Sequence, residues 1–329
     1  MNALIAVGLV AGLFVLGMVG GWIGLTWTLG VVLPYVVASW FLVALVSRVL
    51  GWAKSPVPFR IPTTCGQQRS LPWIRHQKLE NPSGGLGAVG RMALEVVFFR
   101  SLLRNTRSAM TEDKRLVYTT DLGLWAGAMA MHGALLVIVV RHLRFAIEPV
   151  PAFVTFVAQA DGFMEIGLPV LFVTSVLLLV GLTYLLLRRL WDPQVRYISL
   201  VGDYFPLLLL LGIGASGVWM RHVTKVDVAG VKELALGLMH FSPTVPAGIH
   251  PIFFGHLFLV CVLLAYLPLG KLLHMAGVFL SPTRNLANNS RAVRHVNPWD
   301  HPVTVHTYAE YEDEFREKMI AAGLPVEKE

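Results

Sequence analysis

Four histidines lie within long apolar stretches of the sequence, where an ionisable side chain is costly and usually serves a function. His132 and His142 are ten residues apart in one stretch, and His256 and His274 are eighteen apart in a later one. At 3.6 residues per turn, eighteen residues make five turns, so His256 and His274 would face the same side of a helix, about 27 Å apart. Ten residues make about 2.8 turns and about 15 Å. Because neutral imidazole binds metals, two such helices could hold metal centres between them.

The composition indicates which elements carry these histidines. The 329 residues are 55% hydrophobic and only 14% charged, whereas soluble proteins are about 25% charged. A helix of about 20 apolar residues spans a bilayer. We therefore expect an all-α integral membrane protein of about six transmembrane helices. The expected spans are 3–21, 25–47, 122–145, 166–187, 204–220 and 251–280.

The segments outside these spans differ strongly in charge. The loop 51–120 holds 11 Lys or Arg against four Asp or Glu, and the tail 281–329 holds six Lys or Arg. The turn between the first two spans and the segment 146–166 hold none, although 221–249 holds three. Because basic loops stay on the cytoplasmic side, both termini and 51–120 are predicted to be cytoplasmic. The net charge of +7 thus reflects topology in the cytoplasmic membrane, with lipid and no nucleic acid as a partner.

These features divide the chain into four parts. They are a transmembrane hairpin (1–50), a basic cytoplasmic loop (51–120), a four-helix domain that carries the four histidines (121–280) and a cytoplasmic tail (281–329). Apolar residues at helical spacing predict an amphipathic helix within 90–103, and a charged helix is expected at 309–321.

With this topology the two histidine-bearing spans are antiparallel. His142 would lie near the outer face opposite His256, and His132 would lie toward the inner face opposite His274. Each pair could clamp one iron, which predicts a di-haem cytochrome b bundle. A proton or ion transporter and a structural membrane anchor, with histidines used in packing, remain alternatives. Basic side chains near the pairs are candidates for binding the haem propionates: Arg141 and Arg144 outside, and Lys271 inside.

The histidine pattern resembles the cytochrome b gamma subunit of respiratory nitrate reductase over residues 120–280. In that family such histidines are the axial ligands of two b haems, and electrons taken from quinol near the outer haem pass inward. The resemblance implies the same pairs, His142 with His256 and His132 with His274. It also implies a quinone site near the outer haem, for which the candidate polar groups are Arg141, Asp161, Glu165 and His240.

Three further stretches resemble the DsrM family, the cytochrome b membrane subunits of DsrMKJOP complexes in dissimilatory sulfur metabolism. They are FRIPTTCGQQRSLPWI (59–74), GRMALEVVFFRSLLRNT (90–106) and DPQVRYISLVGDYFPLLLLLGIGASG (192–217). The resemblance implies menaquinol as electron donor and a cytoplasmic, heterodisulfide-reductase-like iron–sulfur partner, DsrK. The implied acceptor is the trisulfide of DsrC, and DsrJ, DsrO and DsrP are further implied partners. The sequence leaves open whether electrons flow toward sulfite reduction or in the opposite direction.

Overall fold

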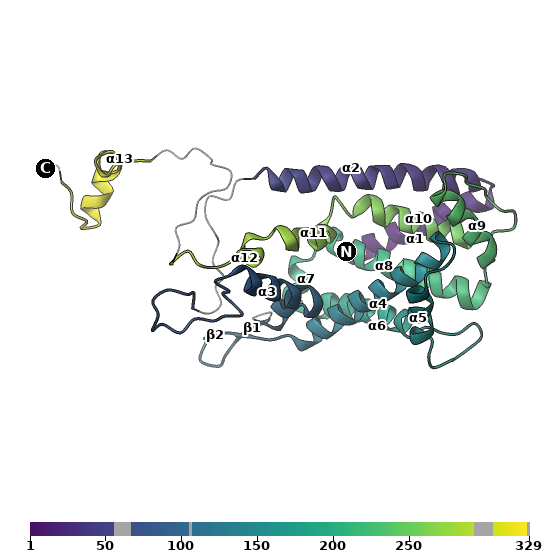
Figure 1. The fold of residues 1–329 in the computed structure, drawn as a ribbon, viewed down its shortest axis with the longest axis horizontal. Helices are drawn as coiled ribbons and strands as arrows, with labels where there is room; N and C mark the ends of the chain where they lie inside the picture. Colours follow the sequence, from purple (N-terminus) through teal and green to yellow (C-terminus); the bar gives the residue numbers. More distant parts are fainter. Residues whose placement is uncertain (56–66, 105–106, 293–304, 328–329) are drawn as a thin grey trace.

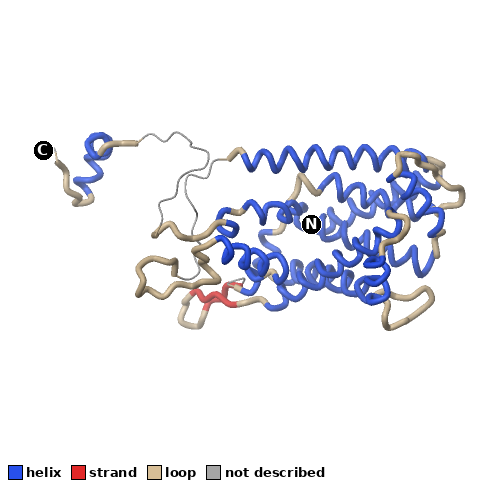
Figure 2. Tube along the Cα trace, in the orientation of Figure 1, coloured by secondary structure: helices blue, strands red, loops and turns tan. Residues whose placement is uncertain are grey.

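The computed structural model describes residues 1–55, 67–104, 107–292 and 305–327, and these form an almost wholly helical chain (Figures 1 and 2). Part of the stretch 59–74, including Cys65, lies outside the described residues. The long helices run side by side along the long axis in Figure 1. They are α1 (Asn2–Trp22), α2 (Leu33–Ala53) with the π-helical turn η1 (Thr28–Val32) before it, α4 (Leu122–Ala146), α6 (Val173–Trp191), α8 (Val201–Trp219) with the π-helical turn η3 (Met220–Thr224) after it, and α10 (Pro251–Tyr266).

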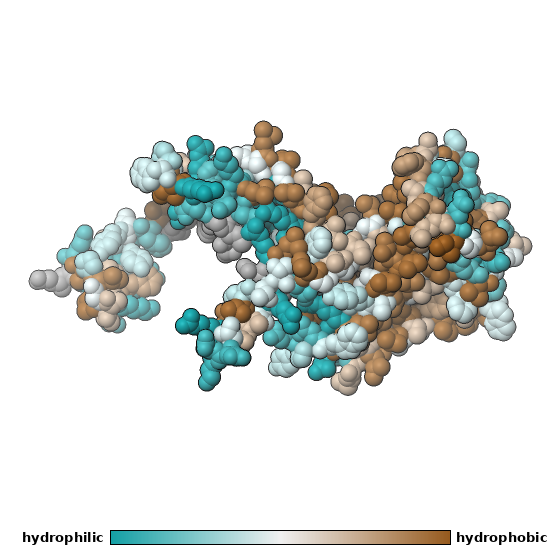
Figure 3. Space-filling model, turned by 90° about the horizontal axis from the view of Figure 1, so that it is seen from below, coloured by the Kyte–Doolittle hydropathy of each residue, from teal (hydrophilic) through white to brown (hydrophobic). Residues whose placement is uncertain are grey.

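These helices are apolar on all sides. Five of them are long and apolar enough to cross a membrane, and at most about a fifth of each such span is buried against the rest of the chain. Large apolar side chains such as Leu16, Val43 and Leu136 point outward instead. In Figure 3 apolar side chains cover much of the bundle, and polar side chains lie toward both of its ends, with most of them on the left. A helix that is hydrophobic all round in this way belongs in a lipid environment, so the multi-pass membrane prediction is confirmed.

The helices pack in a continuous series. α4 packs on α6, α6 on α8, and α8 on both α1 and α10, while α2 covers the outer side of α10. Small residues bring α1 and α10 close together: a Cβ on Gly17 would lie 2.6 Å from the Cβ of Phe258, and one on Gly255 would lie 2.9 Å from the Phe14 ring. Close packing at small residues is typical of membrane helices. It fixes α10 against the N-terminal hairpin.

The sixth predicted span is not one helix, so the sequence-based expectation of a continuous helix over 251–280 is wrong. α10 ends at Tyr266, and the chain resumes as short turns bent by 70° from it. Pro268 and Gly270 lie in the break, where proline removes a backbone donor and disfavours helix before it. The turns are η4 (Lys271–Leu273), α11 (His274–Gly277) and η5 (Val278–Leu280). The distance of five helical turns between His256 and His274 therefore does not apply.

The two ends of the bundle carry different caps. One end, called the α3 end, carries α3 (Gly85–Phe98), the 3-10 helix η2 (Arg100–Leu103), α7 (Pro193–Ile198), α12 (Pro282–Asn285) and an antiparallel hairpin of β1 (Arg107–Met110) and β2 (Leu116–Thr119). The opposite end, called the α9 end, carries α5 (Ala152–Asp161) and α9 (Val228–Met239) (Figure 1). α13 (Tyr308–Ala321) lies apart from the bundle in Figure 1.

Several predicted boundaries shift. α3 with η2, and α13, occupy the regions predicted to be helical at 90–103 and 309–321. The hairpin was not expected in an all-α chain, and it is confined to the polar loop. The fourth span begins at Val173 and not at 166, because the chain forms a turn that contains Pro169.

The loop and the tail fold together at the α3 end. Asn288 donates a hydrogen bond to the buried Asn81 side chain at 2.8 Å. Arg91 of α3 donates to the carbonyls of Glu80, at 3.0 Å, and Thr283. Segments far apart in the sequence thus form one polar cap over the end of the bundle at which His132 and His274 lie.

Candidate functional site

His132 and His274 lie side by side at the α3 end. Their ring centroids are 6.1 Å apart, and their ring planes differ by 80°. Two imidazoles that bind one metal through bonds of about 2.0 Å have centroids roughly 6 Å apart. Phe99, which ends α3 in the left-handed conformation, contacts the His132 ring at 4.9 Å. The pair therefore has the spacing of two ligands on one ion.

His142 and His256 lie toward the α9 end. His142 is within the last two turns of α4, and His256 is in the second turn of α10. The two helices are antiparallel, so both histidines lie at a similar level of the bundle. The His142 and Phe145 ring centroids are 5.7 Å apart, and His142 is in part exposed at the surface of the described chain.

The four imidazoles share one hydrogen-bonding pattern. The Nδ1–H groups of three of them donate to backbone carbonyls: His132 to Ala128 at 2.9 Å, His142 to Ile138 at 2.7 Å and His274 to Lys271 at 2.9 Å. A carbonyl cannot donate, so Nδ1 must carry the proton in each ring. Each Nε2 is then left with a free lone pair, which is the state of a metal-binding histidine whose other nitrogen is held in place.

His256 follows the same pattern through a side chain. Its Nδ1 lies 2.9 Å from Oγ of Ser216 on α8. The Ser216 hydroxyl donates to the carbonyl of Gly212 at 2.7 Å, so it accepts from His256. Ser216 is a polar residue in an apolar span, and this signal could have identified it from the sequence.

The structure also tests whether a flat cofactor has room beside these rings. A Cβ on Gly133, next to His132, would have no neighbour within 4 Å, and the residues His142 and His274 are in part exposed. Gly255 is instead used in packing on α1. At the α3 end, the free Nε2 atoms, the ring spacing of His132 and His274 and the open space beside Gly133 are compatible with a planar cofactor.

Two of the predicted quinone-site residues form a buried ion pair at the α9 end. Nε of Arg141 lies 2.8 Å from Oδ2 of Asp161, and both side chains are buried. Thr174 donates to Asp161 through its N–H at 2.8 Å and its hydroxyl at 2.6 Å. The Arg141 guanidinium also lies 3.7 Å from the centre of the Phe172 ring, which Arg221 contacts at 4.5 Å. Arg141 is thus held by protein groups and not directed toward solvent.

A cavity of about 440 Å³ lies on the other side of this cluster. Its wall includes Phe172, so the aromatic ring joins the buried ion pair to the cavity. Two basic groups, Arg144 and Arg221, and two further polar groups, Gln159 and Glu165, also line it. The mixed polar and apolar lining suits a flat ligand that carries hydrogen-bonding oxygens.

The remaining predicted residues lie elsewhere. His240 is exposed at the end of α9 and does not line the cavity, so the structure does not bring it together with Glu165. Lys271 lies at the α3 end as expected, but its amine pairs with Asp203 at 2.6 Å. Sequence reasoning missed Asp203, Ser216, Phe172 and Arg221.

The fold and this arrangement define a multi-pass helical membrane protein with two histidines on each of two antiparallel segments of the chain. The model of the nitrate reductase gamma subunit family matches residues 92–295. Proteins named Hdr-like menaquinol oxidoreductase cytochrome b-like subunit, from Archaeoglobus fulgidus and Archaeoglobus profundus, are each 41% identical to this chain. Each match covers 82% of this chain, and they cover 83% and 81% of the two relatives, respectively.

The chain therefore belongs to the nitrate reductase gamma subunit family. This confirms the family resemblance drawn from the spacing of the histidines. The more specific resemblance to DsrM stays a prediction.

Proposed function

We propose that this chain is a di-haem b membrane subunit that oxidises menaquinol and delivers the electrons to an iron–sulfur partner. The observation that carries the proposal is the set of four histidines whose Nδ1 atoms are all hydrogen-bonded and whose Nε2 atoms are free. Membership of the gamma subunit family and the names of the two relatives support it.

His142 and His256 would hold one haem, and His132 and His274 the other. Haem b would supply reversible one-electron transfer at each position. The protein's part is to fix each imidazole through its Nδ1–H bond and to exclude water with the surrounding helices. Arg144 is a candidate for binding a propionate at the α9 end. Arg141 and Lys271 are weaker candidates, because each is already paired with a carboxylate.

We place menaquinol oxidation in the cavity at the α9 end. Oxidation of a quinol releases two electrons and two protons, so the site needs groups that bind the oxygens and accept protons. Arg144 and Arg221 would bind the oxygens, Glu165 would accept one proton, and the second proton would pass to water at the open side of the cavity. Arg141 and Asp161 would hold Phe172 in the wall. His240, which does not line the cavity, would take no part.

The orientation and the partners complete the proposal. The Lys- and Arg-rich loop and tail would place the α3 end and both termini in the cytoplasm. There the polar cap would dock an iron–sulfur subunit resembling heterodisulfide reductase, as the relatives' name suggests. In the more specific form of the proposal, this partner is DsrK, and the electron acceptor is the DsrC trisulfide. DsrJ, DsrO and DsrP would be further subunits of the complex, and the chain would act in sulfur metabolism.

An optical spectrum tests the central claim. Protein purified from haem-replete cells should show a low-spin b-type α band after dithionite reduction, with two haems per chain. A colourless protein would contradict the proposal and favour an ion pathway through the same histidines. A haem-containing protein whose electron transfer survives loss of His142 or His256 would favour a structural anchor.

A second measurement tests the cavity. Glu165→Gln should slow menaquinol-driven haem reduction by about 100-fold, the lower range for loss of a proton-accepting group. Reduction by dithionite should be unchanged, because the variant retains both histidine pairs. His240→Ala is the matched control, since this exposed residue lies outside the cavity. Equal rates in all three proteins would remove Glu165 from the site.

A further inference from the structure

The position of His274 is not set by the helix that precedes it. α10 ends at Tyr266, and the segment that begins at Lys271 turns away by 70°. A rigid helix would fix His274 relative to His256, but the break removes that constraint. Other contacts must therefore hold the His274 imidazole beside His132.

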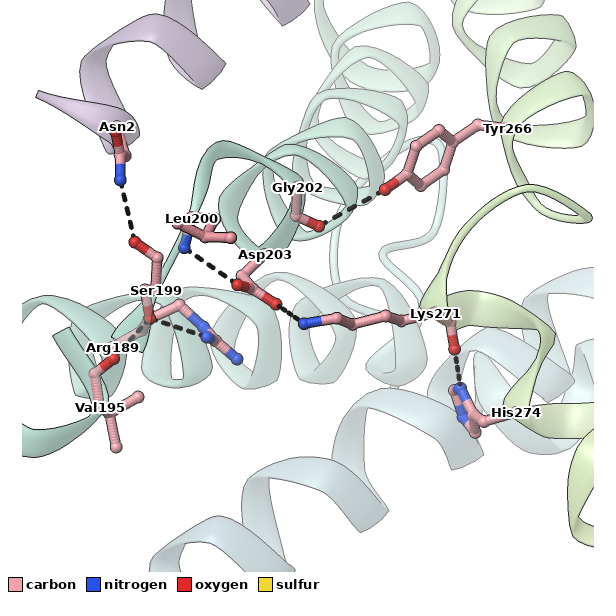
Figure 4. Close-up of polar contacts among 10 residues, drawn as sticks. All are labelled: Asn2, Arg189, Val195, Ser199, Leu200, Gly202, Asp203, Tyr266, Lys271 and His274. Carbon is pink, nitrogen blue, oxygen red and sulfur yellow. Dashed lines mark hydrogen bonds and ion pairs between the residues drawn. The ribbon is translucent and has the colours of Figure 1, made fainter. Parts of the chain in front are cut away.

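One chain of polar contacts reaches the His274 ring (Figure 4). Its Nδ1–H donates to the carbonyl of Lys271 at 2.9 Å, within the 3-10 turn. The Lys271 amine in turn donates to Oδ1 of Asp203 at 2.6 Å. The backbone and the side chain of one residue thus connect the imidazole to α8.

The position of the Asp203 carboxylate is fixed by a backbone hydrogen bond and by burial. Its Oδ2 accepts the N–H of Leu200 at 3.0 Å, which closes the first turn of α8, and its side chain is 10% exposed. Ser199, the residue before Leu200, accepts two hydrogen bonds (Figure 4). Its carbonyl accepts from the Asn2 side chain at 3.0 Å, and its hydroxyl accepts from Arg189 at 2.9 Å. The end of α8 is therefore tied to α1 and α6, and provides a fixed point outside α10.

We propose that Asp203 and Lys271 are positioning residues for His274. Their ion pair holds the 3-10 turn, so that the Lys271 carbonyl keeps its hydrogen bond to Nδ1 and the imidazole stays directed toward His132. This inference rests on the proposed function, because it assigns to the pair a role toward the haem held by His132 and His274. The strength of the Nδ1–H bond governs how strongly an imidazole donates electrons to a metal.

The same ion pair contributes little to folding. The Lys271 side chain is 81% exposed, and ion pairs that reach solvent contribute little to stability. Variants at these positions should therefore fold. Their effect should appear in the electronic properties of one haem.

The test is a redox titration of the full chain, purified with both haems, in wild type, Asp203→Asn and Lys271→Met. A looser Lys271 carbonyl makes His274 a weaker donor, so the midpoint potential of one haem should rise in both variants. A purely Coulombic effect gives the opposite sign for Lys271→Met, because loss of a positive charge lowers the potential. Lys271→Met is therefore the decisive variant, and a fall in its potential would overturn the proposal.

Two further variants sharpen the result. Lys271→Arg keeps a donor for Asp203 and should restore the wild-type potential. Lys232→Met removes an ion pair of the same type, with Glu148 at the α9 end, and should leave the potential of the affected haem unchanged. A shift of equal size in Lys232→Met, or unchanged potentials in both variants of the pair, would also overturn the proposal. Absence of two haem signals in wild type would instead overturn the proposed function.

Discussion

The two histidine pairs lie at opposite ends of one bundle, and they are positioned by different means. His142 and His256 both lie on uninterrupted helices, so helix geometry alone sets their level. At the α3 end only His132 lies on such a helix, and His274 follows a break. The comparison teaches that two uninterrupted helices are sufficient to set the level of the first pair, and the Ser216 hydroxyl of α8 then orients the His256 ring. In the second pair the level of His274 depends on the contact between Lys271 and Asp203 of α8.

The charged groups beside the two histidine pairs differ in how far they are exposed to solvent. At the α9 end the Arg141 and Asp161 side chains are 9% and 3% exposed, while at the α3 end Lys271 is 81% exposed. Removing one partner of a buried pair leaves a charge without compensation, whereas an exposed charge is solvated by water. Substitution in the buried ion pair should therefore lower the free energy of unfolding far more than substitution of the exposed lysine.

The largest expected effect is the loss of one haem when one histidine of either pair is replaced. His142→Ala should remove only the haem at the α9 end, and His132→Ala only the haem at the α3 end, because each substitution removes one of the two histidines that would hold that haem. Haem content per chain, measured as the pyridine haemochrome, should fall by half in each variant. Each variant should retain a different haem, so the midpoint potential of the remaining haem should differ between the two variants.

His240→Ala is the control for a lost histidine, because this exposed side chain has no role in either pair, and it should keep both haems. Loss of both haems in His132→Ala would show that the two ends are not independent. In that case the comparison between the ends would not hold.

The next effect concerns the buried charge. Asp161→Asn should lower the free energy of unfolding by about 3–5 kcal/mol, because the Arg141 guanidinium would remain buried without its counter-charge. Lys271→Met should change it by no more than about 1 kcal/mol. Chemical unfolding of the purified proteins in detergent measures both. Similar losses in the two variants would contradict the difference in burial between the two ends.

Much of the helical framework could be predicted from the sequence, because apolar length alone identifies a membrane span. The starts and ends of α1 and α4 lie within one residue of the predicted ones. The break after α10 was missed, although Pro268 and Gly270 inside the predicted span are a recognisable signal. The error came from treating the eighteen residues between the two histidines as continuous helix.

The candidate site was predictable in part for a different reason. Histidines in apolar spans are conspicuous, and antiparallel topology is enough to pair them. The Arg141 pairing with Asp161 depends on how the turn after α5 folds back, and Asp203 meets Lys271 only because the chain breaks after α10. Such contacts join segments far apart in the sequence, and no local pattern encodes them.

A smaller effect is expected at Ser216. Ser216→Ala removes the acceptor for the Nδ1–H of His256, and an unsatisfied buried donor costs about 1–3 kcal/mol. The potential of the haem at the α9 end should also rise, while that of the other haem stays constant. Ser175→Ala on α6 is the matched control. A shift confined to the α3-end haem would show that the two pairs are not tuned separately.

The smallest effect lies at the start of α4, outside the membrane span. Burial of Asp121 acts to raise its pKa, but the N–H of Leu124 and the Arg188 guanidinium outweigh burial and lower it below the ordinary value of 3.8. A carboxyl with a lowered pKa in the folded state stabilises above that ordinary value, and this contribution is lost as pH falls through the folded-state pKa. Asp121→Asn keeps a side-chain oxygen that caps α4 but loses the negative charge that pairs with Arg188. It should therefore cost at most about 1 kcal/mol near pH 7, and the difference from wild type should shrink in acid.

Thermal unfolding of wild type and variant between pH 7 and pH 3 measures this difference. Asp113→Asn, in the exposed turn of the hairpin, is the matched control for replacing an aspartate outside the membrane span. A constant gap between wild type and Asp121→Asn across the whole range would mean that the carboxylate charge contributes nothing. The link between α4 and α6 would then depend on neutral hydrogen bonds, unlike the buried charge pair at the opposite end of α4.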